Sequence, residues 1–407
     1  MGNTPNIRFK GFTDDWEQRK LGDMGSTFTG LSGKTKEDFG HGDAQFITYM
    51  NVFSNPVANL EMTEAVEIDA NQNSVKKGDV FFTTSSETPE EVGMSCVMPE
   101  NKDNIYLNSF CFGYRPTEKF DLDYLAYVLR ADSFRKEMTF LAQGISRYNI
   151  SKNKVMEVSI PVPNLEEQTM IGRYFSTLDH LITLHQRKCD ETKKLKKFML
   201  QKMFPKKDAK KPEIRFAGFT DDWEQRKLGD NIVEYTEVTT ENNQYPPLTS
   251  SRKGIFLQTK YFAGNQIASD DNTGYNIVPY GYFTYRHMSD DEIFHFNIND
   301  IVENGIVSTL YPVFTTDENL DSRYLQYQLN YGHEFAKFAI LQKQGGSRTY
   351  MYLNKLKQLY LTMPKSVEEQ KAISAFFMNL DHLITLHQRK CEKLKELKKF
   401  MLQNMFV

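Results

Sequence analysis

The sequence predicts an α+β protein: two globular domains with twisted sheets, separated by two long antiparallel, coiled-coil-like helices, in an internal pseudo-two-fold duplication. Two repeats predict this fold. Residues 7–23 recur at 214–230 with 16 of 17 positions identical, and residues 178–204 recur at 380–406 with 22 of 27 positions identical. The inserts between them share only scattered residues. Because such self-similarity marks a repeated structural unit, we expect one duplicated scaffold that carries two different inserts.

The second repeat of each half predicts a long helix. Asn164 and Ser366 each stand three residues before a glutamate, a spacing at which side chain and backbone satisfy each other's free groups at a helix start. No proline or glycine interrupts 173–204 or 371–406, and about 40 residues give a rod of roughly 60 Å. An apolar stripe predicts the packing positions of an antiparallel helix pair. These positions are Leu178, Leu181, Ile182, Leu195, Met199, Leu380, Leu383, Ile384, Leu397 and Met401.

Each insert is expected to form an α+β globule. Residues 79–83 and 281–285 have the composition of strands bounded by turns, whereas 124–129 and 324–329 look helical. The expected boundaries are 1–162 for the first globular domain with its N-terminal repeat, 163–204 for the first spacer helix, 205–213 for a linker, 214–363 for the second globular domain with its repeat, and 364–407 for the second spacer helix.

Composition excludes several classes of protein. No stretch approaches 18 uninterrupted apolar residues, and the first ten residues lack an apolar signal core, so we expect a cytoplasmic protein without a membrane span. The four cysteines form no C-x-x-C pair, which favours reduced thiols over a disulfide framework or a structural metal. His185 and His387 lie on or beside the apolar stripe and are interpreted as packed or edge histidines without a metal role.

Catalytic motifs are weak or incomplete. The segment Gly30–Thr35 ends like a phosphate-binding loop, but Phe28 stands where that loop needs its first glycine. Asp79, Glu100 and Lys102 fit the loose carboxylate and E-x-K spacing with which nucleases hold Mg²⁺, although the second insert has no counterpart. We therefore expect a binding protein without a catalytic residue, with an Mg²⁺-dependent nuclease as the less favoured alternative.

Four phrases together carry a family resemblance: GFTDDWEQRKLGD in both halves, KGDVFFTTSSETPEEVG at 77–93, PNLEEQ at 163–168, and the repeated LDHLITLHQRKC helices that end in LKKFMLQ and MF. In this order they resemble the specificity (S) subunit of type I restriction-modification systems over essentially the whole chain. The resemblance implies a non-catalytic DNA reader with two target recognition domains held by conserved spacer helices. It also implies partners, namely two methyltransferase (modification) subunits and restriction (nuclease-translocase) subunits. S-adenosylmethionine, ATP and Mg²⁺ are then expected on those partners, and no cofactor is expected in this chain.

Such a reader would recognise two short DNA sequences separated by a fixed gap. Half-sites one helical turn apart lie about 34 Å from each other on double-stranded DNA, within reach of domains on rods of the predicted length. The charge distribution adds a condition. Residues 24–150 and 231–352 carry net charges of -7 and -6, whereas 185–211 carries +8. Because backbone affinity comes from neutralised phosphates, we expect weak DNA binding by this chain alone and electrostatic help from the methyltransferase subunits.

Base reading requires polar side chains on loops that reach a groove edge. In the first insert the candidates are Lys34, Thr35, Lys36, Thr84, Ser85, Ser86, Arg147, Tyr148 and Asn149. In the second insert they are Ser250, Ser251, Arg252, Lys253, Arg286, His287, Ser347, Arg348 and Tyr350. The second insert also holds 13 tyrosines in 122 residues, for which packing is the commoner use.

The acidic pair Asp14 and Asp15 beside Trp16 recurs at 221–223 in the second half. Its place in the scaffold favours a structural role or methyltransferase docking over DNA contact. A different class of function stays open, a duplicated protein-binding scaffold without a DNA role, which the acidic inserts and interaction-prone helices would suit. Sequence-specific DNA binding in the presence of a methyltransferase subunit distinguishes the two.

Overall fold

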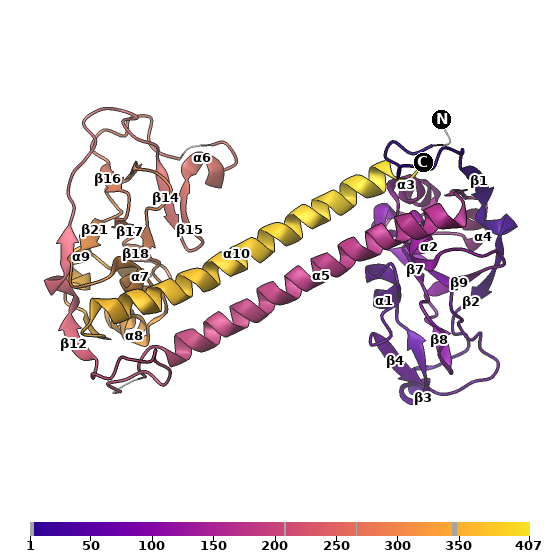
Figure 1. The fold of residues 1–407 in the computed structure, drawn as a ribbon, viewed down its shortest axis with the longest axis horizontal. Helices are drawn as coiled ribbons and strands as arrows, with labels where there is room; N and C mark the ends of the chain where they lie inside the picture. Colours follow the sequence, from indigo (N-terminus) through magenta and orange to yellow (C-terminus); the bar gives the residue numbers. More distant parts are fainter. Residues whose placement is uncertain (1–3, 207–208, 266, 344–347) are drawn as a thin grey trace. The chain divides into compact units, whose positions relative to one another are not determined.

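The structure is a computed structural model that describes residues 4–206, 209–265, 267–343 and 348–407. The chain forms two compact units (Figure 1). The first unit comprises Met1–Arg187 and His387–Val407, and the second unit comprises Lys188–Leu386. Each unit therefore combines one β-rich domain with parts of both long helices, α5 (Leu165–Lys202) and α10 (Val367–Asn404).

The first unit contains a four-stranded antiparallel sheet and a three-stranded mixed sheet. The four-stranded sheet has the order β2 (Gly25–Thr29), β9 (Cys111–Pro116), β5 (Val80–Thr83), β7 (Ser95–Val97). The three-stranded sheet has the order β4 (Thr63–Val66), β3 (Phe39–Ile47), β8 (Ile105–Leu107), with β3 and β8 parallel. Two further pairs are β1 (Glu17–Lys20) with β11 (Ser159–Val162), and β6 (Ser85–Ser86) with β10 (Tyr148–Asn149).

Short helices connect these strands. The α-helices are α1 (Tyr49–Ser54), α2 (Leu122–Val128), α3 (Asp132–Leu141) and α4 (Lys152–Met156). The 3₁₀ helices are η1 (Leu21–Asp23), η2 (Lys36–Asp38) and η3 (Pro89–Glu91). The strand expected at 79–83 forms from Val80, and the helix expected at 124–129 forms two residues earlier, where Asp121 accepts a hydrogen bond from the Tyr124 N–H.

The second unit repeats this plan with shorter strands. Its four-stranded sheet has the order β13 (Ile232–Glu234), β21 (Val313–Thr316), β17 (Phe283–Thr284), β19 (Asn297–Ile298). The paired strands are β14 (Leu248–Ser251) with β15 (Gly254–Leu257), β16 (Asn276–Pro279) with β20 (Asn304–Val307), β12 (Glu224–Lys227) with β23 (Tyr360–Met363), and β18 (Met288–Ser289) with β22 (Thr349–Tyr350). The helices are α6 (Gln258–Tyr261), α7 (Ser322–Tyr331), α8 (His333–Leu341), α9 (Leu353–Leu356) and η4 (Leu228–Asp230).

Each domain core includes the end of a long helix from the other half of the sequence. In the first unit Phe406, just after α10, stacks on Phe175 with ring centroids 5.6 Å apart, and both belong to the buried cluster around Tyr124. In the second unit Phe204, just after α5, stacks on Phe377 at 6.0 Å. Since 204 and 406 are corresponding repeat positions, the duplicated segment performs the same packing task in both units.

The N-terminal repeat of each half anchors the start of its own long helix. Asn164 accepts a hydrogen bond from the Glu167 N–H at 2.9 Å, and Ser366 accepts one from the Glu369 N–H at 3.2 Å, which confirms the two predicted helix caps. The glutamate side chains, however, do not turn back to the cap. The Glu167 carboxylate accepts from the Arg8 guanidinium at 2.7 and 2.9 Å and from the indole of Trp16 at 3.0 Å.

Corresponding contacts exist in the second unit. Arg215 donates to Glu369 at 2.6 and 2.7 Å, and the Trp223 indole donates to the same carboxylate at 3.2 Å. Trp16 and Trp223 are 1% and 3% exposed, so the conserved phrase of the repeat has a structural use. The neighbouring aspartates, Asp14, Asp15, Asp221 and Asp222, are exposed.

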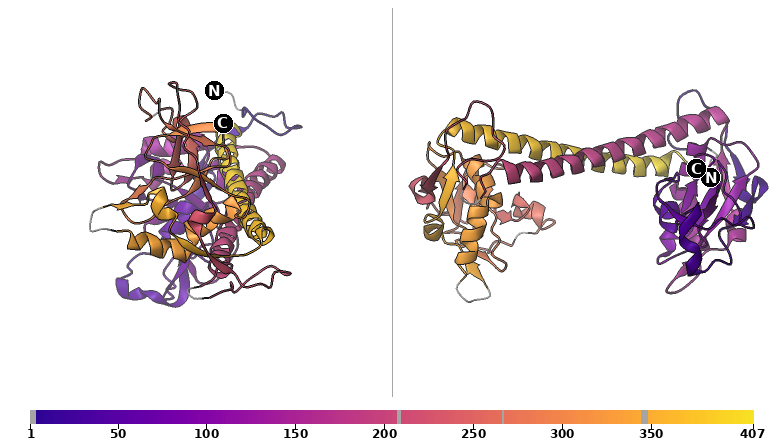
Figure 2. Two further views of the ribbon diagram at one scale, coloured as in Figure 1. Left: turned by 90° about the vertical axis from the view of Figure 1, so that its left-hand side faces the viewer. Right: turned by 90° about the horizontal axis from the view of Figure 1, so that it is seen from below.

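The long helices pack antiparallel along each unit (Figure 2). In the first unit Lys398 donates to Asp179 at 2.6 Å, and the Cys391 thiol approaches the Ile182 carbonyl at 3.9 Å. In the second unit Lys196 donates to Asp381 at 2.6 Å, and Cys189 approaches the Ile384 carbonyl at 3.9 Å. These are corresponding repeat positions, so one set of residues supplies the same pairing in both units. Together with the two β-rich domains, this confirms the predicted fold class.

The packing face of the helices differs from the predicted stripe. Leu195, Leu383 and Leu397 are 46%, 41% and 40% exposed, and Leu181 lies beside the face that packs. Buried or half-buried side chains alternate at spacings of three and four, as in a coiled coil. They are Leu178, Ile182, His185, Cys189, Thr192, Lys196 and Met199 in α5 with Met203 directly after it, and Leu380, Ile384, His387, Cys391, Leu394, Lys398 and Met401 in α10 with Met405 directly after it. This set of positions is called the seam below.

The physical reason for the difference is the composition of the seam. Histidine, cysteine, threonine and lysine occupy more than half of its positions in α5, so a search for apolar residues selects neighbouring leucines instead. The lysines fit because their ammonium groups reach Asp179 and Asp381 while their stems stay in the seam. Among the described residues, no helix is long and apolar enough to cross a membrane.

Candidate nucleic-acid interface

A two-residue strand pair in the first domain brings two candidate segments together. Strand β6 pairs with β10, with Ser86 opposite Tyr148 and Ser85 opposite Asn149. The Ile150 N–H donates to the Thr84 carbonyl at 2.9 Å, and the Thr84 N–H donates to Phe110 at 3.0 Å. The candidate segments 84–86 and 147–149, which lie about sixty residues apart in sequence, are therefore side by side.

The second domain has an equivalent strand pair. Strand β18 pairs with β22, with Ser289 opposite Thr349 and Met288 opposite Tyr350. The Met351 N–H donates to the His287 carbonyl at 2.7 Å, and the His287 N–H donates to Leu310 at 3.4 Å. The hydrogen bonds of His287 thus correspond to those of Thr84. The match places Arg147 and Arg348 at the same position of the two domains.

Of the candidate DNA-contacting residues at this strand pair of the first domain, some are exposed to solvent and others are buried. Arg147 and Asn149 are exposed and Tyr148 is half-buried. Ser85 and Ser86 are only 5% and 7% exposed, and Ser86 donates to Glu91 at 3.2 Å. The serines therefore stabilise the turn, and the chain segment that reaches solvent is 147–149.

The corresponding region of the second domain carries a stack of aromatic rings. His287 is buried, and its ring stacks on Tyr352 with centroids 5.1 Å apart and planes at 23°. Tyr352 in turn stacks on Tyr350 at 5.9 Å and 12°. Tyr350 and Tyr352 are 37% and 51% exposed. Arg348 donates to Asp290 at 2.9 Å, Arg286 is exposed, and Ser347 lies outside the described residues.

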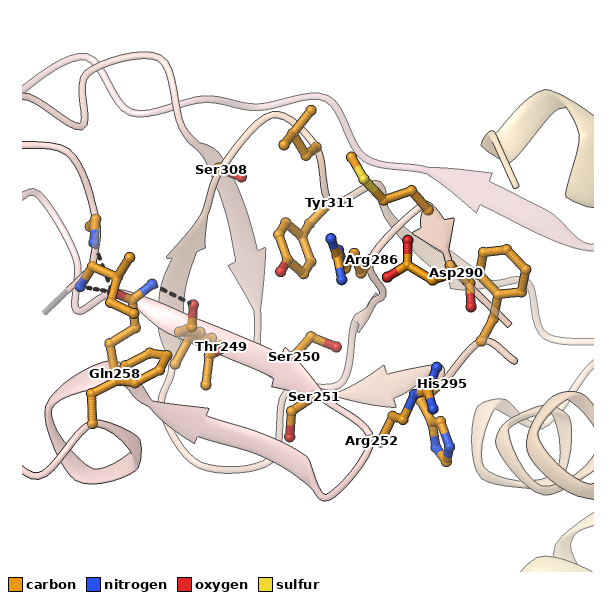
Figure 3. A pocket seen from close by; sticks show the side chains of 18 of the residues that line it. Thr249, Ser250, Ser251, Arg252, Gln258, Arg286, Asp290, His295, Ser308 and Tyr311 are labelled. Atoms are coloured by element: carbon orange, nitrogen blue, oxygen red, sulfur yellow. Dashed lines mark hydrogen bonds between the residues drawn. The ribbon is translucent and has the colours of Figure 1, made fainter. Parts of the chain in front are cut away.

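A cavity of about 550 Å³ opens in the second domain next to this region (Figure 3). It brings together Arg286 and three candidates from the turn of the β14–β15 hairpin, Ser250, Ser251 and Arg252, whereas Lys253 is exposed outside its lining. Its polar lining also includes residues that the sequence did not single out, namely Thr249, Gln258, Asp290, His295, Ser308 and Tyr311. The cavity is thus lined by groups that can both donate and accept hydrogen bonds.

Local interactions fix several of these side chains. Ser250 donates to the Thr284 carbonyl at 3.0 Å and accepts from Asn297 at 2.8 Å. Arg252 donates to Asp291 at 2.7 Å, and this ion pair holds the pKa of the aspartate well below its usual range. Burial, aided by the charge of Arg252, lowers the pKa of His295. The imidazole of His295 is therefore disfavoured as a cation. Both arginines of the cavity lining, Arg252 and Arg286, are exposed, and Arg252 is paired with Asp291.

In the segment Gly30–Thr35, which ends like a phosphate-binding loop, Lys34 and Thr35 already bind carboxylates of the same domain. Lys34 forms ion pairs with Asp69 at 3.2 Å and Asp38 at 3.8 Å, and Thr35 donates to Asp38 at 2.6 Å through its N–H and at 2.9 Å through its hydroxyl. Hydrogen bonds from Gln72, Asn71 and Lys34 lower the pKa of Asp69 to about 2. Thr35 and Lys36 are exposed, and of the three candidates only Lys36 has no such restraint among the described contacts.

The residues of the nuclease alternative have other structural uses. The Asp79 carboxylate is 1% exposed and accepts from Arg115 at 2.7 and 2.6 Å and from the Lys76 N–H at 2.7 Å. Lys102 donates to Gln45 at 2.6 Å. Within the described parts of the chain, no group of three or more histidine, cysteine, aspartate or glutamate side chains is placed to hold a metal ion. The geometry gives the nuclease alternative no support.

Sequence reasoning missed two half-buried arginines, Arg130 and Arg135, that bind distant loops of the first domain. Arg130 donates to the carbonyls of Ser95, Val52, Phe53 and Asn55 at 2.7 to 3.1 Å, and burial lowers its pKa to about 10. Arg135 likewise donates to three carbonyls between residues 90 and 93. No local pattern marks these arginines, because the carbonyls they bind come from distant loops. Tyr352, by contrast, could have been found from its spacing of two from Tyr350, because alternate residues of an extended segment lie on the same side.

Two β-rich domains that carry equivalent two-residue strand pairs, each beside an exposed arginine, on a duplicated helical scaffold define a two-domain protein with an internal repeat. The family described as the type I restriction modification DNA specificity domain matches residues 13–194. Residues 13–194 thus belong to this family, and over 95% of its length the chain is similar to a specificity (S) subunit of a type I restriction-modification system.

Individual relatives agree with this assignment. A protein of Methanocaldococcus jannaschii, provisionally named type I restriction enzyme MjaX specificity subunit, is 26% identical over 414 residues, which cover 95% of this chain and 91% of that protein. The type I restriction enzyme MjaVIII specificity subunit of the same organism is 26% identical over 312 residues, which cover 68% and 67% of the two chains. The crystal structure of a type I restriction-modification system S subunit from M. genitalium has the same fold, with a TM-score of 0.61, 13% identity and 99% coverage of both chains.

Proposed function

We propose that this chain reads a bipartite DNA target, with one recognition domain per half-site, and docks two methyltransferase subunits on its duplicated scaffold. The observation that carries the proposal is the equivalence of the β6–β10 and β18–β22 strand pairs. Each presents an arginine, Arg147 or Arg348, at the same exposed position. Arginine is the side chain that most often recognises a base edge, because its guanidinium binds guanine bidentately.

The side chains around this common position support two different half-sites. In the first domain Arg147 is accompanied by Asn149, whose amide suits adenine. In the second domain the corresponding residue is Tyr350, which stacks on Tyr352, and the cavity lined by Arg286 lies close by. The two domains thus share the same backbone arrangement around the arginine but differ in the neighbouring side chains. A protein that reads two different half-sites requires such a difference.

Charge supports a division of labour with the partner subunits. The exposed carboxylates around the recognition domains disfavour the close approach of phosphates, so much of the DNA backbone affinity would come from the methyltransferase subunits. Asp14, Asp15, Asp221 and Asp222 are exposed beside the buried Trp16 and Trp223 and are available for docking these subunits. Restriction subunits would join that complex, and the partners would bind S-adenosylmethionine, ATP and Mg²⁺. Such a complex acts on DNA in the cytoplasm.

The test is single-molecule methylome sequencing in a host without type I systems. The chain is expressed with a matching methyltransferase subunit, and the methyltransferase alone is the control. We expect a new bipartite methylated motif, of which one half changes when residues 24–150 are exchanged for the insert of another S subunit. An assembled complex that methylates no new motif would contradict the proposal and favour the protein-binding scaffold.

A further inference from the structure

The two repeats meet at a pair of histidines. His185 of α5 and His387 of α10 occupy corresponding seam positions, and both belong to the first unit. Their Nδ1 atoms are 2.9 Å apart, and their ring centroids are 5.2 Å apart with planes at 37°. Both side chains are half-buried. Local sequence patterns do not predict this contact, because the two histidines lie 202 residues apart.

The geometry of this contact restricts the protonation of the two rings. A hydrogen bond between two Nδ1 atoms requires one donor and one acceptor, so the two imidazoles cannot both be charged. At least one Nδ1 lone pair therefore points toward the opposite ring. A neutral imidazole nitrogen with an aimed lone pair is the commonest protein ligand of transition metals.

The distance between the rings suits a shared metal ion. A zinc–nitrogen bond is about 2.0 to 2.1 Å, and two such bonds at a tetrahedral angle place the nitrogens roughly 3.3 Å apart. The Nδ1 atoms need to separate by only about 0.4 Å, which small rotations of the two rings provide. Hard ions such as Mg²⁺ and Ca²⁺ prefer oxygen ligands, whereas imidazole suits zinc, copper and nickel.

We propose that His185 and His387 together bind one divalent transition-metal ion of the zinc type through their Nδ1 atoms, with water completing the coordination. Metal binding requires both Nδ1 atoms to be unprotonated, so the ring that donates in the His185–His387 contact must carry its proton on Nε2 instead. Cys391, one helical turn beyond His387, is directed at the Ile182 carbonyl and at Gln186 Oε1, 3.9 and 3.7 Å away. Within the described parts of the chain, no third histidine, cysteine, aspartate or glutamate is placed as a ligand beside the two imidazoles, and an ion held by two imidazoles would be exchangeable rather than permanently held.

The consequence of the ion is a cross-link between the repeats. It would join α5 to α10 across 202 residues of intervening chain. Ligand binding to the folded state alone raises its stability in proportion to occupancy. Zinc would thus strengthen the helix pairing in the first unit.

The experiment uses the full-length chain after complete removal of any histidine tag. Isothermal titration with Zn²⁺, and Co²⁺ absorption spectra as an independent readout, measure the number of ions and their affinity. We expect one ion per chain, and His185→Gln or His387→Gln should weaken its binding by roughly tenfold or more. His180→Gln and His382→Gln are matched controls, because these exposed histidines occupy corresponding positions of the same helices and should leave binding unchanged.

A second readout keeps the test decisive if a variant folds poorly. The thermal midpoint of the unaltered chain should rise with Zn²⁺ and return to its starting value after chelation. An unchanged midpoint, absence of binding at millimolar Zn²⁺, or equal losses in the control variants would overturn the proposal. In that case the two histidines act only as a polar contact that sets the helix register.

Discussion

The guanidinium of Arg8 binds the carboxylate of Glu167 through two hydrogen bonds of 2.7 and 2.9 Å, across 159 residues of sequence. The carboxylate is fully buried, and the arginine side chain is 12% exposed. Arg215 and Glu369 repeat this relationship in the second unit. A buried charge is tolerated only when it is paired and hydrogen-bonded, so each N-terminal repeat determines whether its helix can begin where it does.

Glu167→Ala should therefore destabilise the first unit strongly. It leaves the Arg8 charge and the Trp16 N–H without their buried acceptor, a loss of about 3 to 5 kcal/mol for a buried pair. Because Trp16 and Trp223 are the only tryptophans of the chain, urea unfolding followed by fluorescence in a Trp223→Phe background reports on the first unit. Glu166→Ala, at the exposed neighbour, is the control and should shift the midpoint little. Equal effects of the two substitutions would contradict the assigned role.

The seam predicts that substitutions at two adjacent residues of α10 lower the free energy of unfolding by very different amounts. Ile384→Asp places a charge between the helices, where it lacks a partner, and should lower the free energy of unfolding by about 2 to 3 kcal/mol. Leu383→Asp, at a position that is 41% exposed, should change it by less than about 0.5 kcal/mol. Urea unfolding followed by Trp223 fluorescence in a Trp16→Phe background compares the two variants. A larger effect at Leu383 would restore the stripe predicted from the sequence.

Because Arg147 and Arg348 occupy equivalent positions in the two domains, we expect that replacing either one impairs recognition of one half-site only. Arg147→Ala and Arg348→Ala should each weaken binding of the methyltransferase-loaded complex to its target by about 10- to 100-fold, with relaxed specificity in one half-site only. Fluorescence anisotropy with DNA duplexes altered in either half measures both effects. Arg173→Ala, an exposed substitution on α5, is the control. If either variant relaxes both half-sites equally, the one-domain, one-half-site assignment fails.

The lowered pKa of His295 predicts a pH dependence in the second unit. The unfolded chain takes up a proton at His295 near its ordinary pKa of about 6.5, whereas the folded protein resists it because the ring is half-buried near Arg252. Stability should therefore be fully present above that pH and should fall as the pH drops toward the folded pKa. His295→Gln should reduce this loss when Trp223 fluorescence in urea is compared at pH 7.5 and 5.5. An identical loss in the variant would assign the dependence to other groups.

The sequence predicted those parts of the fold that local patterns determine. The repeats, the two long helices and the caps at Asn164 and Ser366 depend on residues within a few positions of each other. Six of the ten predicted packing positions lie in the seam, and its polar members were missed because they acquire partners only in the folded chain, as Lys398 does with Asp179. The strand pair between Ser86 and Tyr148 and the ion pair between Asp79 and Arg115 join distant segments. No periodicity encodes such pairings, so the chemistry of these residues could be named beforehand but not their neighbours.

The contacts between each N-terminal repeat and its long helix, which are the same in both units, also affect how such a protein can acquire new recognition domains. The residues that attach a recognition domain to the scaffold, from Arg8 and Trp16 to Glu167, are the same in both halves and lie outside the divergent inserts. A recombination event within the near-identical segments 7–23 and 214–230 therefore delivers a new insert with its attachment residues already matched. Selection can then act on the insert alone, because the exchanged domain needs no compensating change in the rest of the molecule.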